Sequence, residues 1–249
     1  MMQPTMCGIA ENDCHQQRTH EYYECAREEM LDFVPQRART VLDIGCGAGR
    51  FGSLLKQRQP VEIWGVEPDT NAARQASTRL DHVLVGDFPS GVRLPERYFD
   101  CIQFNDVLEH MVDPWHALRV AQGCLSDQGV VVASIPNVRF LPILYRLLVR
   151  GEWTYTPSGI LDKTHLRFFT RSTILKMFEE TEYQVVRMRG MFPDGHWQTK
   201  ILLGVAPWIV KDARYMEYAV VARPASQLGA LSEESTAGQS GMLLQSEGF

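Results

Sequence analysis

The sequence lacks the features that mark several large protein classes. Its 249 residues include six cysteines, with no CxxC pair and no zinc-finger spacing, and its first residues lack the basic and apolar regions of a signal peptide. These absences favour the reducing cytoplasm over an oxidising compartment. The apolar runs are too short to cross a bilayer, which argues against stable membrane insertion.

Positive charge is also scarce. The chain has 25 Lys and Arg against 30 Asp and Glu, giving a formal net charge of -5, and its basic residues are scattered along the sequence. A nucleic-acid partner requires a clustered basic surface, so none is expected. With 45% hydrophobic residues the chain can bury the core of one large domain, although composition does not determine its oligomeric state.

Three parts of the chain differ in composition. Residues 1–19 are polar and lack periodicity, and residues 225–249 are rich in Ser, Gly, Glu and Gln, so both ends are predicted to be mobile. Residues 20–224 form the predicted domain. It opens with an expected helix at 20–34, in which Met30 and Phe33 fall on one apolar face.

Predicted strands alternate with predicted helices through the rest of this domain. Such alternation indicates an α/β fold, in which helices cover both faces of a mainly parallel sheet. Ligands of these folds bind at the carboxyl ends of the strands. The predicted strands are 41–45, 61–66, 82–86, 99–104, 129–135, 183–190 and 215–223, and the predicted helices are 50–57, 70–80, 114–125 and 170–180, the last with Thr170 as its N-cap.

A glycine loop follows the first strand, in the sequence VLDIGCGAGRFG. Gly45, Gly47 and Gly49 allow a ligand to approach the backbone closely. A dinucleotide fingerprint would place its third glycine where Arg50 stands, and the carboxylate of Asp43 would repel a pyrophosphate. The loop therefore predicts a ligand that carries an amino group.

Acidic residues also follow the next two strands. Glu67, before Pro68, is placed to accept hydrogen bonds from a ribose diol. Asp87 can accept from the exocyclic amine of adenine while Phe88 lies against the ring. An amine, a ribose and an adenine together describe S-adenosylmethionine.

These motifs, followed by FDCIQFNDVLEH, resemble the successive motifs of class I S-adenosylmethionine-dependent methyltransferases over about residues 22–223. The resemblance implies a Rossmann-like fold with seven strands, mainly parallel, the last antiparallel. It also implies that Asn105 contacts the amino group of the cofactor through its backbone. The predicted cofactor-binding residues are Asp43, Gly45, Cys46, Gly47, Gly49, Glu67, Pro68, Asp87, Phe88, Asn105 and Asp106.

The acceptor is expected to be a small molecule. The segment NDVLEHMVDPW resembles methyltransferases that act on small molecules, including those of ubiquinone biosynthesis, and it lacks the signature of enzymes that methylate amino groups of nucleic acids. Oxygen is therefore the favoured acceptor atom. An insertion at 138–169 is predicted to roof the acceptor pocket, with Asn137, Trp153 and Tyr155 as substrate contacts.

Within this insertion, GILDKTHLRFFT is similar to stretches of bacterial methyltransferases associated with surface-polysaccharide assembly, which favours a saccharide hydroxyl. A quinone or phenolic acceptor and a noncatalytic S-adenosylmethionine-binding protein remain the alternatives. Trp153 and Tyr155 can equally be anchors that hold the insertion to the core.

His110 is the predicted general base, because it follows the fourth strand on the side where cofactor and acceptor meet, and His165 is the second candidate. The alternative for His110 is to brace a helix, and for His165 a structural bond to Asp162. A metal site built from Glu109, His110, Asp113 and His116 would lack any established spacing such as HExxH, so no metal is expected.

Overall fold

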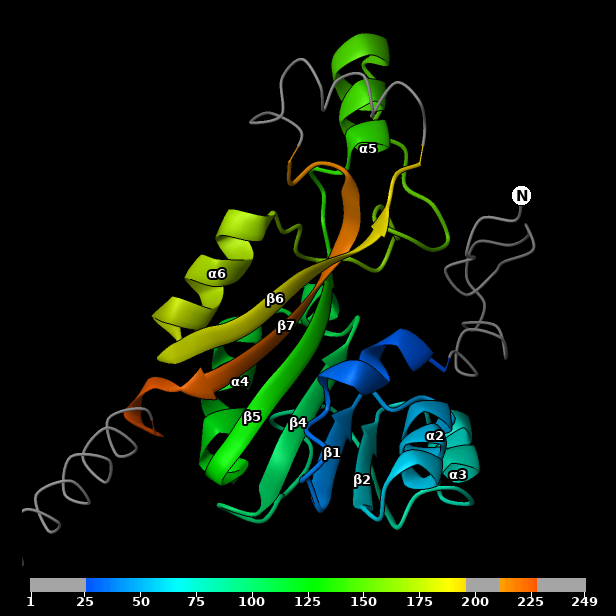
Figure 1. The fold of residues 1–249 in the computed structure, drawn as a ribbon. Coiled ribbons are helices and arrows are strands. Elements are labelled where there is room, and N and C mark those ends of the chain that lie inside the picture. Colours follow the sequence, from blue (N-terminus) through cyan, green and yellow to red (C-terminus); the bar gives the residue numbers. More distant parts are fainter. Residues whose placement is uncertain (1–25, 196–210, 228–249) are drawn as a thin grey trace, which may run out of the picture.

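A computed structural model describes residues 26–195 and 211–227 (Figure 1). The predicted mobile ends, 1–19 and most of 225–249, lie outside these ranges. Residues 225–227 are described, and they contact the domain: Ala225 N donates to Glu182 O at 2.8 Å, and Gln227 Nε2 donates to Ser126 O at 3.0 Å. These two bonds hold the described start of the tail against the domain, and the boundary at 224 stays a prediction.

Seven strands form one sheet in the order β3-β2-β1-β4-β5-β7-β6. The pairs that join β1 to β2, β1 to β4, β2 to β3 and β4 to β5 are parallel, whereas β7 is antiparallel to both β5 and β6. The predicted sheet is thus confirmed. The strands are β1 Thr40–Ile44, β2 Glu62–Glu67, β3 His82–Val85, β4 Phe99–Asn105, β5 Leu125–Pro136, β6 Tyr183–Pro193 and β7 Tyr215–Pro224.

Helices cover both faces of this sheet because its strands are apolar on both sides. On one face Leu42 and Phe104 belong to a core that includes residues of α4 (Pro114–Cys124) and α6 (Arg171–Glu180). On the other face Val41 and Val132 belong to a core with η1 (Glu28–Phe33), α2 (Arg50–Arg58) and α3 (Thr70–Ala76). Thr170 caps α6, as predicted, by accepting a hydrogen bond from Thr173 N.

The predicted first helix at 20–34 differs from the structure within the described residues. Only Glu28–Phe33 is helical, and it is a 3-10 helix. Arg27 before it has left-handed backbone angles, φ 47° and ψ 45°, so no α-helix continues through this position. Met30 and Phe33 are nevertheless buried, as their spacing predicted.

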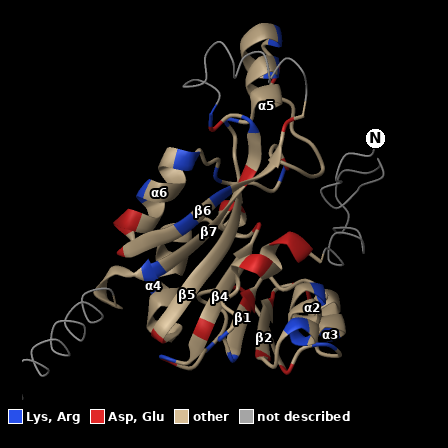
Figure 2. Cartoon of the chain, viewed as in Figure 1, with Lys and Arg blue, Asp and Glu red and all other residues tan. Residues whose placement is uncertain are grey.

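The insertion at 138–169 forms a separate projection above the strand ends (Figure 1). It contains α5 (Leu141–Tyr145) and a π-helical turn, η3 (Arg146–Arg150), neither of which has a buried residue. A small cluster of Phe140, Ile160 and Leu161 forms its own core. Figure 2 shows Lys and Arg dispersed over many elements, and none of the described helices is long and apolar enough to span a membrane.

Candidate active site

A cavity of about 870 Å³ opens at the carboxyl ends of the central strands, beside the point between β1 and β4 where the strand order reverses. All predicted cofactor-binding residues line it except Gly49. Gly49 instead precedes α2 with φ 78°, and a Cβ built there would lie 3.1 Å from the backbone of Ala76. Its place in the motif therefore reflects helix packing and backbone conformation rather than a cavity wall.

The glycine loop is held to the end of β2 by backbone hydrogen bonds. Gly45 N and Cys46 N both donate to Val66 O, at 2.8 and 3.2 Å, and Gly47 N donates to Glu67 Oε2 at 2.9 Å. Gly45 has φ 69°, and a Cβ on it would lie 2.7 Å from Val107 Cγ2. Only glycine fits this turn without displacing the neighbouring loop.

Two buried carboxylates adjoin the loop. Burial, together with the nearby charge of Glu67, raises the pKa of Asp43 to about 8. A carboxyl group in this condition gains from a cationic ligand, which is the property predicted for the amino group of the cofactor. Glu67 also accepts from Asp69 N at 3.0 Å, so it ties two loops together at the predicted ribose position.

The remaining cofactor-side residues have distinct environments. Phe88 lies edge-on to Phe104, with ring centroids 6.0 Å apart, and borders the cavity beside Asp87. Burial, with the charge of Asp43, raises the pKa of Cys46 far above the ordinary value of a thiol. A thiol that stays protonated is a poor nucleophile, so Cys46 serves as a small wall residue.

Arg27, which precedes the first strand in sequence, also lines the cavity, and no sequence motif predicted it. Its guanidinium bonds Asp106 Oδ2 at 2.5 Å and Glu217 Oε1 at 2.6 Å, and its Nε lies 3.0 Å from Glu29. Burial opposes the positive charge, but Asp106 and Glu217 outweigh it and raise the pKa of Arg27. For Glu217, in contrast, burial disfavours the carboxylate and raises its pKa to about 7. The predicted cofactor residue Asp106 is thus already paired on one side.

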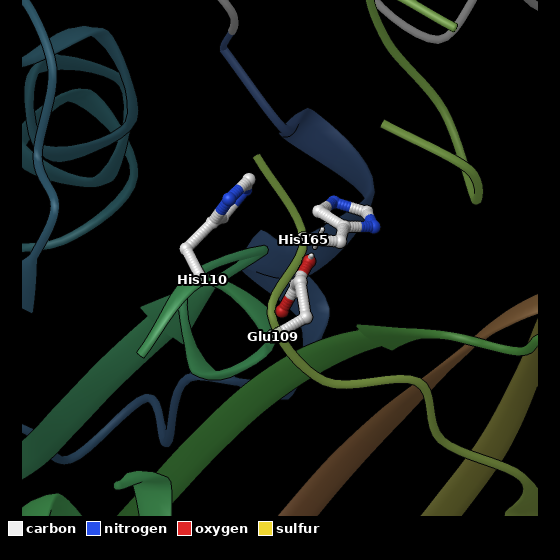
Figure 3. A group of neighbouring side chains, drawn as sticks. All are labelled: Glu109, His110 and His165. Atoms are coloured by element: carbon white, nitrogen blue, oxygen red, sulfur yellow. Dashed lines mark ion pairs between the residues drawn. The ribbon is translucent and has the colours of Figure 1, made fainter. Parts of the chain in front are cut away.

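Both predicted catalytic histidines line the same cavity and lie against each other (Figure 3). His110 belongs to η2 (Leu108–His110), directly after β4, and His165 comes from the insertion. Their ring centroids are 4.6 Å apart with the planes at 71°. Glu109 lies beside them, with Oε1 3.9 Å from His165 Nε2, and burial together with the charge of Asp106 raises its pKa well above the ordinary value.

The hydrogen bonds of the two imidazoles define their tautomers. His110 Nδ1 lies 3.1 Å from Thr164 O, and His165 Nδ1 lies 3.0 Å from Ile160 O. His110 Nδ1 also lies 3.0 Å from Thr164 Oγ1, whose own hydrogen is directed to Asp162 Oδ1. Because a carbonyl oxygen can only accept, these contacts favour a hydrogen on each Nδ1, with the lone pair of the neutral ring on Nε2. The sequence suggested a structural bond of His165 to Asp162, and the structure has a backbone bond between them, from His165 N to Asp162 O at 3.1 Å.

The three predicted substrate contacts do not line the cavity. Asn137 is fully buried, and its Nδ2 donates to Asp212 O and Tyr215 O at 3.0 and 2.8 Å. Trp153 packs on the small core of the insertion, and Tyr155 lies 6.5 Å from Phe168 between ring centroids. The anchoring alternative therefore suits Trp153, whereas Tyr155 is exposed and its role stays a prediction. The insertion residues that line the cavity are Ser158, Gly159, Asp162 and His165.

Comparison with known proteins agrees with this architecture. The model of a methyltransferase-domain family matches residues 15–188. A ubiquinone biosynthesis O-methyltransferase of Aliivibrio fischeri is 29% identical over 173 residues, covering 65% of this chain and 73% of that protein. A trans-aconitate 2-methyltransferase of Methylobacterium radiotolerans is 31% identical over 130 residues, covering half of each chain.

The fold also matches solved structures. The crystal structure of an S-adenosylmethionine-dependent methyltransferase from Archaeoglobus fulgidus superposes with a TM-score of 0.60 at 20% identity, covering 82% of this chain and 94% of the other. Because the family model matches more than half of the sequence, the chain belongs to the methyltransferase-domain family, as a class I enzyme whose expected cofactor is S-adenosylmethionine.

Proposed function

We propose that the enzyme transfers the methyl group of S-adenosylmethionine to a hydroxyl oxygen of a small molecule. The observation that supports this assignment is the position of His110 and His165 in the same cavity as Asp43 and Glu67. One cavity is therefore bordered by carboxylates that suit a cationic nucleoside and by imidazoles that can take the proton of a hydroxyl group.

The chemistry of the transfer explains why imidazoles matter here. The methyl group of a sulfonium is already activated, so the protein has to align the acceptor and exclude water. A neutral hydroxyl must also lose its proton as the C–O bond forms and the C–S bond breaks, with the bonding pair moving to sulfur. An imidazole near neutral pKa assists this proton loss, whereas an amine acceptor with a lone pair needs less help.

A saccharide is the first candidate acceptor and a phenol or quinol the second. The saccharide rests on the similarity of GILDKTHLRFFT to enzymes of polysaccharide assembly, but Trp153 and Tyr155, which would have stacked on a sugar ring, lie outside the cavity lining. The phenolic alternative is favoured by the Aliivibrio fischeri relative, which is named an O-methyltransferase of ubiquinone biosynthesis.

A product screen tests the proposal. The purified chain is incubated with S-adenosylmethionine and panels of nucleotide sugars, catechols, amines and carboxylic acids, and S-adenosylhomocysteine is measured with the mass of each product. We expect a methyl ether from one hydroxyl panel, with formation reduced in His165→Gln. Transfer confined to amines or carboxylates would contradict the proposal that a hydroxyl oxygen accepts the methyl group.

A further inference from the structure

Glu109 is a buried carboxyl group of the cavity that lacks side-chain hydrogen bonds within the described residues. It is 1% exposed, and neither of its carboxylate oxygens has a hydrogen-bond partner among the described residues. A buried carboxylate without hydrogen bonds is costly, and proteins usually provide it with hydrogen bonds, an opposite charge or a metal ion. In Figure 3 this carboxylate points toward the ring of His165.

Two histidines border that carboxylate in the tautomer that binds metals. Each donates Nδ1–H to a backbone carbonyl, of Thr164 for His110 and of Ile160 for His165. Outer hydrogen bonds of this kind orient an imidazole and direct the lone pair of its other nitrogen toward an ion. Thr164 is itself held, because its N and Oγ1 both donate to Asp162 Oδ1 at 2.7 Å.

The backbone also holds the two ligand-bearing segments together. Leu166 N and Arg167 N donate to Glu109 O at 2.9 and 3.0 Å. This pair of bonds joins the turn after β4 to the end of the insertion directly beside all three side chains. Their relative positions therefore depend on tertiary backbone hydrogen bonds.

We propose that Glu109, His110 and His165 bind one divalent transition-metal ion. One possible ligand atom from each residue lies within 4.8 Å of those of the other two. Ligand distances of about 2.0 to 2.2 Å require these atoms to approach somewhat further, which side-chain rotation achieves. Two imidazole nitrogens and one carboxylate oxygen suit Zn²⁺, Co²⁺ or Fe²⁺ better than Mg²⁺ or Ca²⁺, which prefer oxygen ligands.

Three protein ligands leave a coordination position open toward the cavity that His110 and His165 line. This step rests on the proposed function and gives its imidazoles an indirect role, because the ion occupies the Nε2 lone pairs that would otherwise accept the proton. The hydroxyl oxygen of the acceptor takes the open position, and the ion lowers the pKa of that hydroxyl. Its proton passes to water, the oxygen forms the new bond to the methyl carbon, and the C–S electron pair returns to sulfur, giving S-adenosylhomocysteine.

Metal titration of the full chain tests the site without any acceptor. After treatment with a chelator and its removal, the protein is titrated with Zn²⁺ by calorimetry and with Co²⁺ by visible absorption. We expect one ion per chain and a Co²⁺ spectrum of nitrogen and oxygen ligation. Glu109→Gln and His110→Gln should each weaken Zn²⁺ binding by at least about a hundredfold, because each removes one of three ligands.

His116→Gln is the matched control, since His116 also borders the cavity but is outside the group of three. It should keep one ion per chain. His110 is only half-buried, so His110→Gln remains informative if Glu109→Gln fails to fold. Thermal unfolding and S-adenosylhomocysteine binding report the integrity of each variant.

Absence of stoichiometric binding in the folded wild type, or binding that neither variant weakens, would overturn the metal site. Full methyl transfer after removal of all metal would overturn its part in the reaction. Stoichiometric binding in a protein that methylates no hydroxyl would uphold the site and overturn the proposed function instead.

Discussion

The cofactor side and the acceptor side of the cavity are built in different ways. The cofactor side consists of turns that directly follow β1, β2 and β3, so residues such as Asp43 and Glu67 reach the site because their strands are neighbours. The side proposed for the acceptor combines the turn after β4 with Ser158, Gly159, Asp162 and His165 of the insertion. A site of the first kind follows from strand order, whereas a site of the second kind depends on long-range contacts.

The largest effect is expected on the acceptor side. His110→Ala should lower turnover by about a hundred- to ten-thousandfold, because the hydroxyl loses the group that assists its deprotonation, whether directly or through a bound ion. Cofactor affinity, measured by calorimetry, should stay within about twofold. His116→Ala serves as the comparison. Equal turnover in the two variants would show that alignment of the acceptor alone suffices and that His110 has no special role in the reaction.

Arg27 joins the two sides, and its loss should mainly reduce stability. Arg27→Ala leaves the fully buried Glu217 without its cation, which should lower the free energy of unfolding by about 3 kcal/mol. Denaturant unfolding measures this loss. The double variant Arg27→Ala/Glu217→Gln should recover part of it, because no unpaired charge is then buried. No recovery would assign the loss to packing.

On the cofactor side, Glu67→Ala should weaken S-adenosylhomocysteine binding by about ten- to a hundredfold. The change removes charge-assisted hydrogen bonds of roughly 1.5 to 3 kcal/mol and releases the backbone of Gly47. Glu67→Gln keeps one acceptor oxygen and should lose less. Calorimetry that finds unchanged affinity in Glu67→Ala would contradict the ribose assignment.

A pH dependence distinguishes Asp43 from the other cofactor contacts. Burial raises the pKa of Asp43 to about 8, so in the empty cavity the group is largely protonated at pH 6 to 7. Binding a cationic amine favours the carboxylate and releases its proton, so affinity should rise with pH up to about 8, by at most about tenfold per unit. Calorimetry at pH 6 to 7.5 in buffers of different ionisation enthalpy measures the released proton, which Asp43→Asn should abolish.

The smallest effect is expected at Trp153. As an anchor on the core of the insertion, Trp153→Ala should lower the free energy of unfolding by about 1 kcal/mol and change the Michaelis constant of the acceptor less than about threefold. Steady-state kinetics and thermal unfolding separate these effects. A large increase in that constant with unchanged stability would return Trp153 to the substrate-binding role that its sequence position suggested.

The outcome for individual residues follows the same division. The sheet and the positions of Asp43, Glu67 and Asp87 at one cavity were predictable, because a parallel sheet brings successive strand ends to one edge. Asn137 also follows a strand end, but its amide bonds the backbone around β7 instead of facing the cavity. Arg27 had no motif, since its partners Asp106 and Glu217 lie far along the chain.

Sequence by itself therefore determined the succession of the seven strands, the turn that requires glycine at Gly45, and the chemical character expected of the cofactor side. These properties depend on local spacing and on the regular geometry of a parallel sheet. Only the tertiary structure decided which insertion residues reach the cavity and that His165 meets the neighbouring pair Glu109 and His110. The physical reason is that this contact depends on backbone hydrogen bonds that Leu166 and Arg167 donate to Glu109. These residues lie more than fifty positions from Glu109 in sequence, so no local pattern encodes the bonds.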